Sequence, residues 1–156
     1  WDVEALSQAA AEHNPNIVVI TGGEPAIHDL QDLTYSLKEK GLKVHLETSG
    51  AFPIRGNFDW ITLSPKVWKK PIQEAINRAD EFKVIVDSIE AIGLWEQEIG
   101  QDLKSRPVWL HPEWSLRNDS EILGLINKKV KENQFPYRAG YQLHKLYGVD
   151  EEKSTN

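Results

Sequence analysis

The chain of 156 residues contains no cysteine, and this absence excludes several kinds of site at once. Without thiols these residues can form no disulfide, no thiolate zinc site and no iron–sulfur cluster of their own. Methionine is absent as well, and the first residue is Trp1. Because translation starts with methionine, the sequence predicts that an amino-terminal stretch precedes Trp1.

Basic residues are too few to favour binding to long nucleic acid. The chain has 18 Lys and Arg against 24 Asp and Glu, a formal net charge of −6, and no basic stripe that could neutralise a phosphate backbone. No apolar run approaches the roughly 20 residues that cross a bilayer, and the first residues do not resemble a signal peptide. We therefore expect a cytoplasmic protein without nucleic-acid or membrane partners.

The length and the apolar content predict one compact domain. A chain of this length with 40% hydrophobic residues can bury well over half of its unfolded surface. We expect this domain to span residues 1–150 and the polar residues 151–156 to form a disordered tail.

Short apolar runs alternate with helical patterns along the chain. Five runs are predicted to be buried strands, over residues 16–20, 42–46, 60–63, 82–86 and 108–110. Helices are predicted over residues 3–10, over 29–40 with a stop at Gly41, over 71–79, and after the capping residues Asp87 and Asn118. The alternation predicts an α/β fold with mostly parallel strands, either an open doubly wound sheet or part of a barrel.

Polar residues follow four of the predicted strands, at the ends where parallel α/β folds bind ligands. These segments are Thr21-Gly22-Gly23-Glu24-Pro25, Glu47-Thr48-Ser49-Gly50, Ser64-Pro65-Lys66 and His111-Pro112-Glu113-Trp114. Glycines let the backbone approach a ligand, and a carboxylate can accept hydrogen bonds from an ammonium group. Because the carboxyl ends of parallel strands share one edge of the sheet, we expect a shared ligand site.

Each segment also has a purely structural interpretation. Gly22-Gly23 alone is typical of a tight turn, and Glu24 can favour the helix start that follows it. Ser64 is a common turn residue, Lys66 is an ordinary solvated lysine, and His111 is an ordinary hydrogen-bonded loop histidine. Their joint position favours the ligand site, because chance would scatter them over both ends of the sheet.

In combination these segments resemble 7-carboxy-7-deazaguanine synthase, a family of radical S-adenosylmethionine (SAM) enzymes. Residues 21–25 match the GGE motif that holds the amino group of SAM. With the other three segments and the closing Tyr141-Gln142-Leu143-His144-Lys145 stretch, the resemblance covers nearly the whole chain. It implies a partial (β/α) barrel of radical SAM type whose first strand and cluster loop are absent from these residues.

The resemblance also implies a role for each residue of the predicted site. Thr21 and Asp150 would contact the substrate, whereas the family's shorter members end on a proline at the position of Asp150. His111 departs from the glutamine that the family commonly has there. SAM would be bound by Gly22, Gly23, Glu24, Glu47, Ser64, Pro65, Lys66, His111, Pro112, Glu113 and Trp114.

The implied reaction converts 6-carboxy-5,6,7,8-tetrahydropterin to 7-carboxy-7-deazaguanine with loss of ammonia, in queuosine biosynthesis. It uses SAM, Mg²⁺ and a [4Fe-4S] cluster whose three cysteines would lie upstream of Trp1, so no metal ligand is assigned here. Since the cofactors carry the difficult chemistry, no catalytic residue is assigned either.

The resemblance further implies a one-electron reductant such as flavodoxin or ferredoxin, and a homodimer. Trp68, Trp95 and Trp114 are candidates for the dimer surface, although burial in the core explains them equally well. Two alternatives stay open. A glycyl-radical-activating enzyme shares the GGE motif but acts on a protein, and a nucleotide-binding α/β module would have no catalytic activity.

Overall fold

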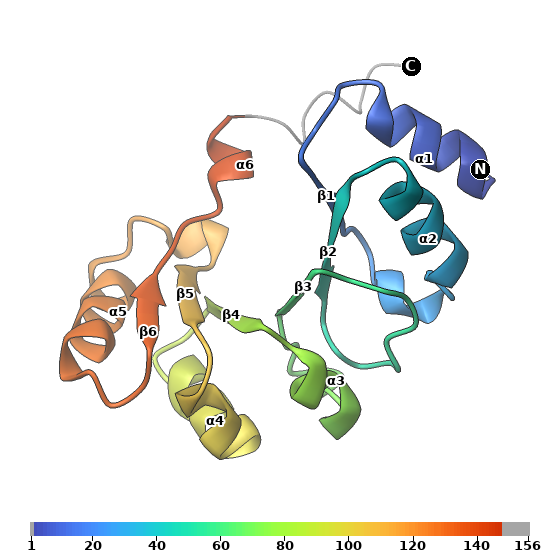
Figure 1. Cartoon of the computed structure of the whole chain (residues 1–156). Helices are drawn as coiled ribbons and strands as arrows, with labels where there is room; N and C mark the ends of the chain where they lie inside the picture. Colours follow the sequence, from blue (N-terminus) through green and yellow to red (C-terminus); the bar gives the residue numbers. More distant parts are fainter. Residues whose placement is uncertain (1, 148–156) are drawn as a thin grey trace. The chain divides into compact units, whose positions relative to one another are not determined.

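The computed structural model describes residues 2–147, which form an α/β fold around parallel strands (Figure 1). The strands are hydrogen-bonded in chain order, and the pairs β1–β2, β2–β3, β3–β4 and β5–β6 are parallel. They are β1 (Ile17–Ile20), β2 (Lys43–Thr48), β3 (Trp60–Leu63), β4 (Glu81–Val86), β5 (Val108–Pro112) and β6 (Tyr137–Ala139). The predicted α/β fold with mostly parallel strands is confirmed. Only β6 was missed, because three residues around an arginine give no apolar run.

The helices follow the predicted alternation. They are α1 (Val3–Ala11), α2 (Gln31–Glu39), α3 (Gln73–Arg78), α4 (Ala91–Ile99), α5 (Ser120–Glu132) and α6 (Leu143–Leu146), with single 3-10 turns η1 (Pro25–Ile27), η2 (Gly100–Lys104) and η3 (Trp114–Leu116). Gly41 stops α2 as predicted, with a φ of 78° and a hydrogen bond from its amide to the Lys38 carbonyl. The prediction that Pro71 opens α3 is wrong, because the helix starts at Gln73 after Ile72.

The described residues divide into two compact units, which meet between Lys83 and Val84 in the sequence. In the first unit, α1 and α2 cover one face of β1 and β2, and Leu37, Leu42 and Val44 form a buried cluster there (Figure 1). Burial alternates along β2, so Val44, Leu46 and Thr48 are buried on one face while His45 and Glu47 are partly exposed on the other.

In the second unit α5 packs on β5 and β6. Val108 and Leu110 of β5 and Ile122 and Ile126 of α5 are all buried. Trp95 in α4 is 3% exposed and belongs to the core, so the core explanation holds for this tryptophan.

Glu96 connects its own helix, α4, to α5 and β6 by hydrogen bonds. Its Oε1 atom accepts hydrogen bonds of 2.8 Å from both Lys129 Nζ and the Tyr137 hydroxyl. Burial and the Glu96 carboxylate raise the pKa of Tyr137 far above its ordinary value. Lys129 is therefore a partly buried ion-pair partner of Glu96 rather than a fully solvated lysine.

The start of α5 provides a direct test of helix capping. The sequence pattern predicted Asn118 as the cap, but Asp119 is the N-cap, and its Oδ1 atom accepts from the amides of Glu121 and Ile122 at 2.9 and 3.0 Å. We expect Asp119→Ala to lower the free energy of unfolding by about 1 kcal/mol, because two amides lose their acceptor. Asn118→Ala is the matched control and should change it by less than about 0.3 kcal/mol. Urea unfolding followed by circular dichroism measures both, and equal effects would contradict this assignment.

Two predictions fall outside the described residues, namely the contact of Asp150 with substrate and the disordered tail at 151–156. Among residues 2–147, no helix combines the length and the apolar character that crossing a membrane requires.

Candidate functional site

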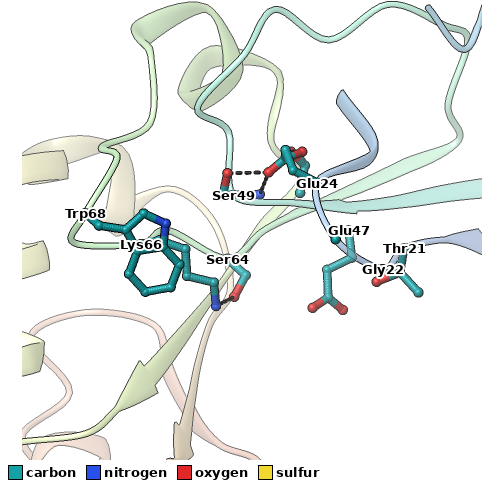
Figure 2. A pocket seen from close by; sticks show the side chains of 10 residues that line it. Thr21, Gly22, Glu24, Glu47, Ser49, Ser64, Lys66 and Trp68 are labelled. Carbon is teal, nitrogen blue, oxygen red and sulfur yellow. Dashed lines mark hydrogen bonds between the residues drawn. The ribbon is translucent and has the colours of Figure 1, made fainter. Parts of the chain in front are cut away.

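A cavity of about 430 Å³ lies at the carboxyl ends of β1, β2 and β3 in the first unit (Figure 2). This volume is in the range of small-molecule sites. The cavity brings together seven residues of the predicted site and adds three others. The seven are Thr21, Gly22, Gly23, Glu24, Glu47, Ser64 and Lys66, and the three are Thr48, Ser49 and Trp68.

The glycine pair after β1 leaves backbone open at the cavity wall. Gly22 and Gly23 have φ angles of 93° and 55°, in a region that residues other than glycine rarely adopt. A Cβ atom built on either residue would meet no protein atom within 4 Å. The loop therefore offers unobstructed backbone to a ligand.

The Glu24 carboxylate connects the loop after β1 to the end of β2. Its Oε1 atom accepts from the Ala26 amide at 3.0 Å and from the Thr48 hydroxyl, and its Oε2 atom accepts from the Ser49 amide at 2.8 Å and from the Ser49 hydroxyl. Burial alone would raise the pKa of Glu24, but the hydrogen bonds from Ser49 and Thr48 outweigh burial and lower it. The carboxylate is thus a fixed negative charge whose four acceptor positions are already occupied by the chain's own donors.

Glu47 stands on the open face of β2 and forms an ion pair with Lys83 of β4. The pair reaches across β3, the strand between them. The Glu47 side chain is one-third exposed at the cavity, whereas the Lys83 side chain is more deeply buried. Lys83 therefore holds the Glu47 carboxylate at the cavity wall.

Ser64 and Lys66 form the wall after β3. The Ser64 amide donates to the Thr48 carbonyl at 2.8 Å, and Lys66 Nζ lies 3.4 Å from the Ser64 hydroxyl. Pro65 between them is buried and does not line the cavity. The result is a cation beside a hydroxyl, a pair that suits a ligand carboxylate or ribose oxygen.

The last predicted segment lies in the second unit. His111 and Pro112 are the final residues of β5 rather than the start of the loop that follows. Gly140 lies against the His111 ring, since a Cβ atom at Gly140 would be 2.1 Å from Nε2 of His111. A residue with a side chain at position 140 would displace the imidazole, so this close approach fixes the position of His111.

Glu113 and Trp114 follow β5 in the turn η3. Hydrogen bonds from the Ser115 hydroxyl and amide hold the pKa of the Glu113 carboxyl below its ordinary value. The Glu113 side chain therefore caps η3. The Trp114 and Tyr141 rings meet edge to face, with their centroids 6.2 Å apart. The Arg117 guanidinium lies 4.5 Å from the centroid of the Trp114 ring.

Sequence reasoning missed four contributors to the site, one of which is Trp68, considered there only for the dimer surface or the core. Thr48 and Ser49 bind Glu24, and Lys83 pairs with Glu47. The hydroxyls stood in a segment already singled out, so only their partner was unknown. Lys83 could not be singled out from the sequence, because a lysine on the open face of a strand is common and its partner across the sheet was unknown.

Among residues 2–147, no group of three or more histidine, aspartate or glutamate side chains could hold a metal ion. With no cysteine in the sequence, these residues do not supply the ligands of an iron–sulfur cluster. SAM does fit them, because open glycine backbone, a fixed carboxylate and a lysine line one cavity.

The fold and this cavity define a parallel α/β protein whose ligand site lies at the carboxyl ends of its strands. The chain belongs to the 7-carboxy-7-deazaguanine synthase family. It is 43% identical over 148 residues to the 7-carboxy-7-deazaguanine synthase of a Synechocystis species, covering 94% of this chain and 69% of that protein. It is 33% identical over 173 residues to the synthase of Prochlorococcus marinus, with 94% and 75% covered.

A solved structure supports the same assignment. The crystal structure of QueE from Escherichia coli superposes with a TM-score of 0.74 and 28% identity, covering 90% of this chain and 64% of that one. The synthase of Flavobacterium psychrophilum is 38% identical to this chain, which spans 61% of its length. No family model matches the chain.

Proposed function

We propose that this chain provides the SAM- and substrate-binding part of a 7-carboxy-7-deazaguanine synthase, a radical SAM lyase of queuosine biosynthesis. One observation carries the proposal. One cavity is lined by open glycine backbone, by the ionised Glu24, by Glu47 and by Lys66. The relatives of this chain are named 7-carboxy-7-deazaguanine synthase.

The residues of the cavity bind and orient the ligands. The backbone at Gly22 and Gly23 receives the amino-acid end of SAM, and Lys66 with Ser64 binds oxygen atoms of the same ligand. Because the acceptor positions of Glu24 are occupied, this residue attracts the ammonium group of SAM by charge rather than by a new hydrogen bond. When bound, SAM supplies the radical chemistry that begins the conversion of the substrate.

The remaining parts of the proposal follow from the family. The substrate is 6-carboxy-5,6,7,8-tetrahydropterin, contacted by Thr21 and Asp150, and residues 111–114 bind the nucleoside side of SAM. The proposal also includes a [4Fe-4S] cluster and Mg²⁺ as cofactors, and a one-electron reductant such as flavodoxin or ferredoxin. The protein would be a homodimer in the cytoplasm.

Binding of S-adenosylhomocysteine, measured by isothermal titration calorimetry, tests the cavity. We expect Gly23→Ala to weaken binding at least about tenfold, because a methyl group takes space left open for the ligand. Gly41→Ala is the matched control, because Gly41 also has a positive φ and an open Cβ position but lies outside the cavity. Unchanged binding by Gly23→Ala would reject this site.

Activity tests the reaction itself. The product of the complete gene, reconstituted anaerobically with iron and sulfide, is expected to form 7-carboxy-7-deazaguanine from SAM and 6-carboxy-5,6,7,8-tetrahydropterin. Cleavage of SAM without this product would keep the radical SAM chemistry and reject the substrate.

A further inference from the structure

Trp68 is the most exposed large hydrophobic side chain in the described part of the chain, at 81%. It stands in a tight turn over residues 66–69, closed by a hydrogen bond of 3.3 Å from the Lys69 amide to the Lys66 carbonyl and by an isolated bridge between these residues. Its neighbour Val67 is 54% exposed. The turn therefore presents two apolar side chains to solvent.

The turn is anchored on both sides, so the exposure of Trp68 belongs to an ordered segment. Before it, the Ser64 amide is bound to the Thr48 carbonyl. Within it, the Lys69 ammonium lies 3.5 Å from the centroid of the Phe52 ring. After it, the Ile72 amide donates to the Gly50 carbonyl at 2.8 Å. These contacts hold the backbone that carries Trp68 beside the cavity.

Trp68 lines the cavity and Val67 does not (Figure 2). Among the ten residues that line this cavity in the described part of the chain, Trp68 is the one aromatic side chain. The others are glycines or polar residues that can bind charged and hydroxyl groups but offer no flat apolar surface. A planar ring bound here would leave its π face in water unless the indole covered it.

We propose that Trp68 is a stacking surface for a planar heteroaromatic ring of the ligand in this cavity. The proposal rests on the proposed function, which supplies two such rings, the adenine of SAM and the pterin of the substrate. Stacking of a nucleobase on an aromatic side chain contributes enough for its removal to weaken binding roughly tenfold. It also accounts for an indole held in solvent beside a polar cavity.

Fluorine NMR of protein labelled with 5-fluorotryptophan tests the stacking directly, and Trp68→Phe identifies the Trp68 resonance by its loss. The probes are S-adenosylhomocysteine and 6-carboxypterin, added separately. We expect one of them to shift the Trp68 resonance. A shift with S-adenosylhomocysteine assigns the ring as adenine, and a shift with 6-carboxypterin assigns it as pterin.

Substitutions provide the second arm. We expect Trp68→Ala to raise the dissociation constant of that probe about tenfold and Trp68→Phe to raise it less than about threefold, because phenylalanine keeps a stacking face. Val67→Ala, in the same turn but outside the cavity, is the control and should leave binding unchanged. Far-ultraviolet circular dichroism checks that each variant is folded.

Three results would overturn the proposal. Tight binding that Trp68→Ala does not alter, with a stationary Trp68 resonance, rejects the stacking and leaves the proposed function intact. No binding of either probe by the wild-type chain rejects both. A Trp68 resonance that moves with protein concentration alone, together with a dimer in sedimentation, assigns the indole to contact with a second copy of the chain.

Discussion

Gly50→Ala is expected to lower the free energy of unfolding by about 3 to 4 kcal/mol. Gly50 has a φ of 74°, which costs another residue about 1 kcal/mol or more. Its new Cβ atom would also lie 2.8 Å from Cδ1 of Leu63 and 3.1 Å from Cβ of Pro71. Leu63 is fully buried, so shifting its side chain disturbs the packed core, and this overpacking adds about 2 kcal/mol.

Gly41→Ala separates the two contributions. Gly41 has a nearly equal φ of 78°, but a Cβ atom there would meet nothing within 4 Å. We therefore expect this variant to lose only about 1 kcal/mol. Urea unfolding followed by tryptophan fluorescence measures both variants. If the two lose equal stability, the contact of position 50 with Leu63 and Pro71 is not what requires glycine.

Glu24→Ala is expected to destabilise the chain by about 3 kcal/mol, because a charged acceptor of four hydrogen bonds disappears. The Thr48 hydroxyl is buried and would have to find a new acceptor. Glu24→Gln keeps the shape and removes the charge, so it should cost less, about 2 kcal/mol. Chemical unfolding at pH 7 checks both values.

The stabilities of wild type and Glu24→Gln, compared at several pH values, test the ionisation of Glu24. The folded-state pKa of Glu24 is lowered from its ordinary value of 4.5, so its contribution is fully present above that value. As the pH falls below 4.5 and through the folded-state pKa, the carboxylate is protonated in both states and the contribution is lost. The stability difference between wild type and Glu24→Gln should shrink over this range. A difference that stays constant from pH 7 to pH 3 would show that ionisation of Glu24 does not stabilise the fold.

Apolar periodicity was sufficient to predict every strand except β6 and most helices, because the spacing of apolar residues follows the buried face of a strand or helix. Local hydrogen bonds were harder to predict. Asn118 and Asp119 are equally good caps by residue type, and only backbone geometry selects Asp119. In the same way Pro71 suits a first helical turn, but the extended backbone of Ile72, with φ −82° and ψ 152°, means that α3 begins at Gln73.

Three of the four predicted segments line the cavity, whereas the contacts between their side chains were not predictable. Parallel strands bring their carboxyl ends together, so residues after β1, β2 and β3 had to share one edge. The sequence could not indicate that the Glu24 carboxylate would accept hydrogen bonds from Thr48 and Ser49. Nor could it indicate that Lys83 would reach across β3 to pair with Glu47. Those contacts depend on side chains from strands distant in the sequence.

The alternation along β2 ties the accuracy of folding to the chemistry of the cavity. Val44 and Leu46 face the core, and Glu47, on the opposite face of the strand, lines the cavity. A slip of one residue in the pairing of β2 with its neighbours would bury the Glu47 charge and expose the valine and leucine. A chain in which β2 is out of register would therefore be destabilised and would also lack the Glu47 carboxylate at the cavity, so loss of stability and loss of the proposed site would occur together.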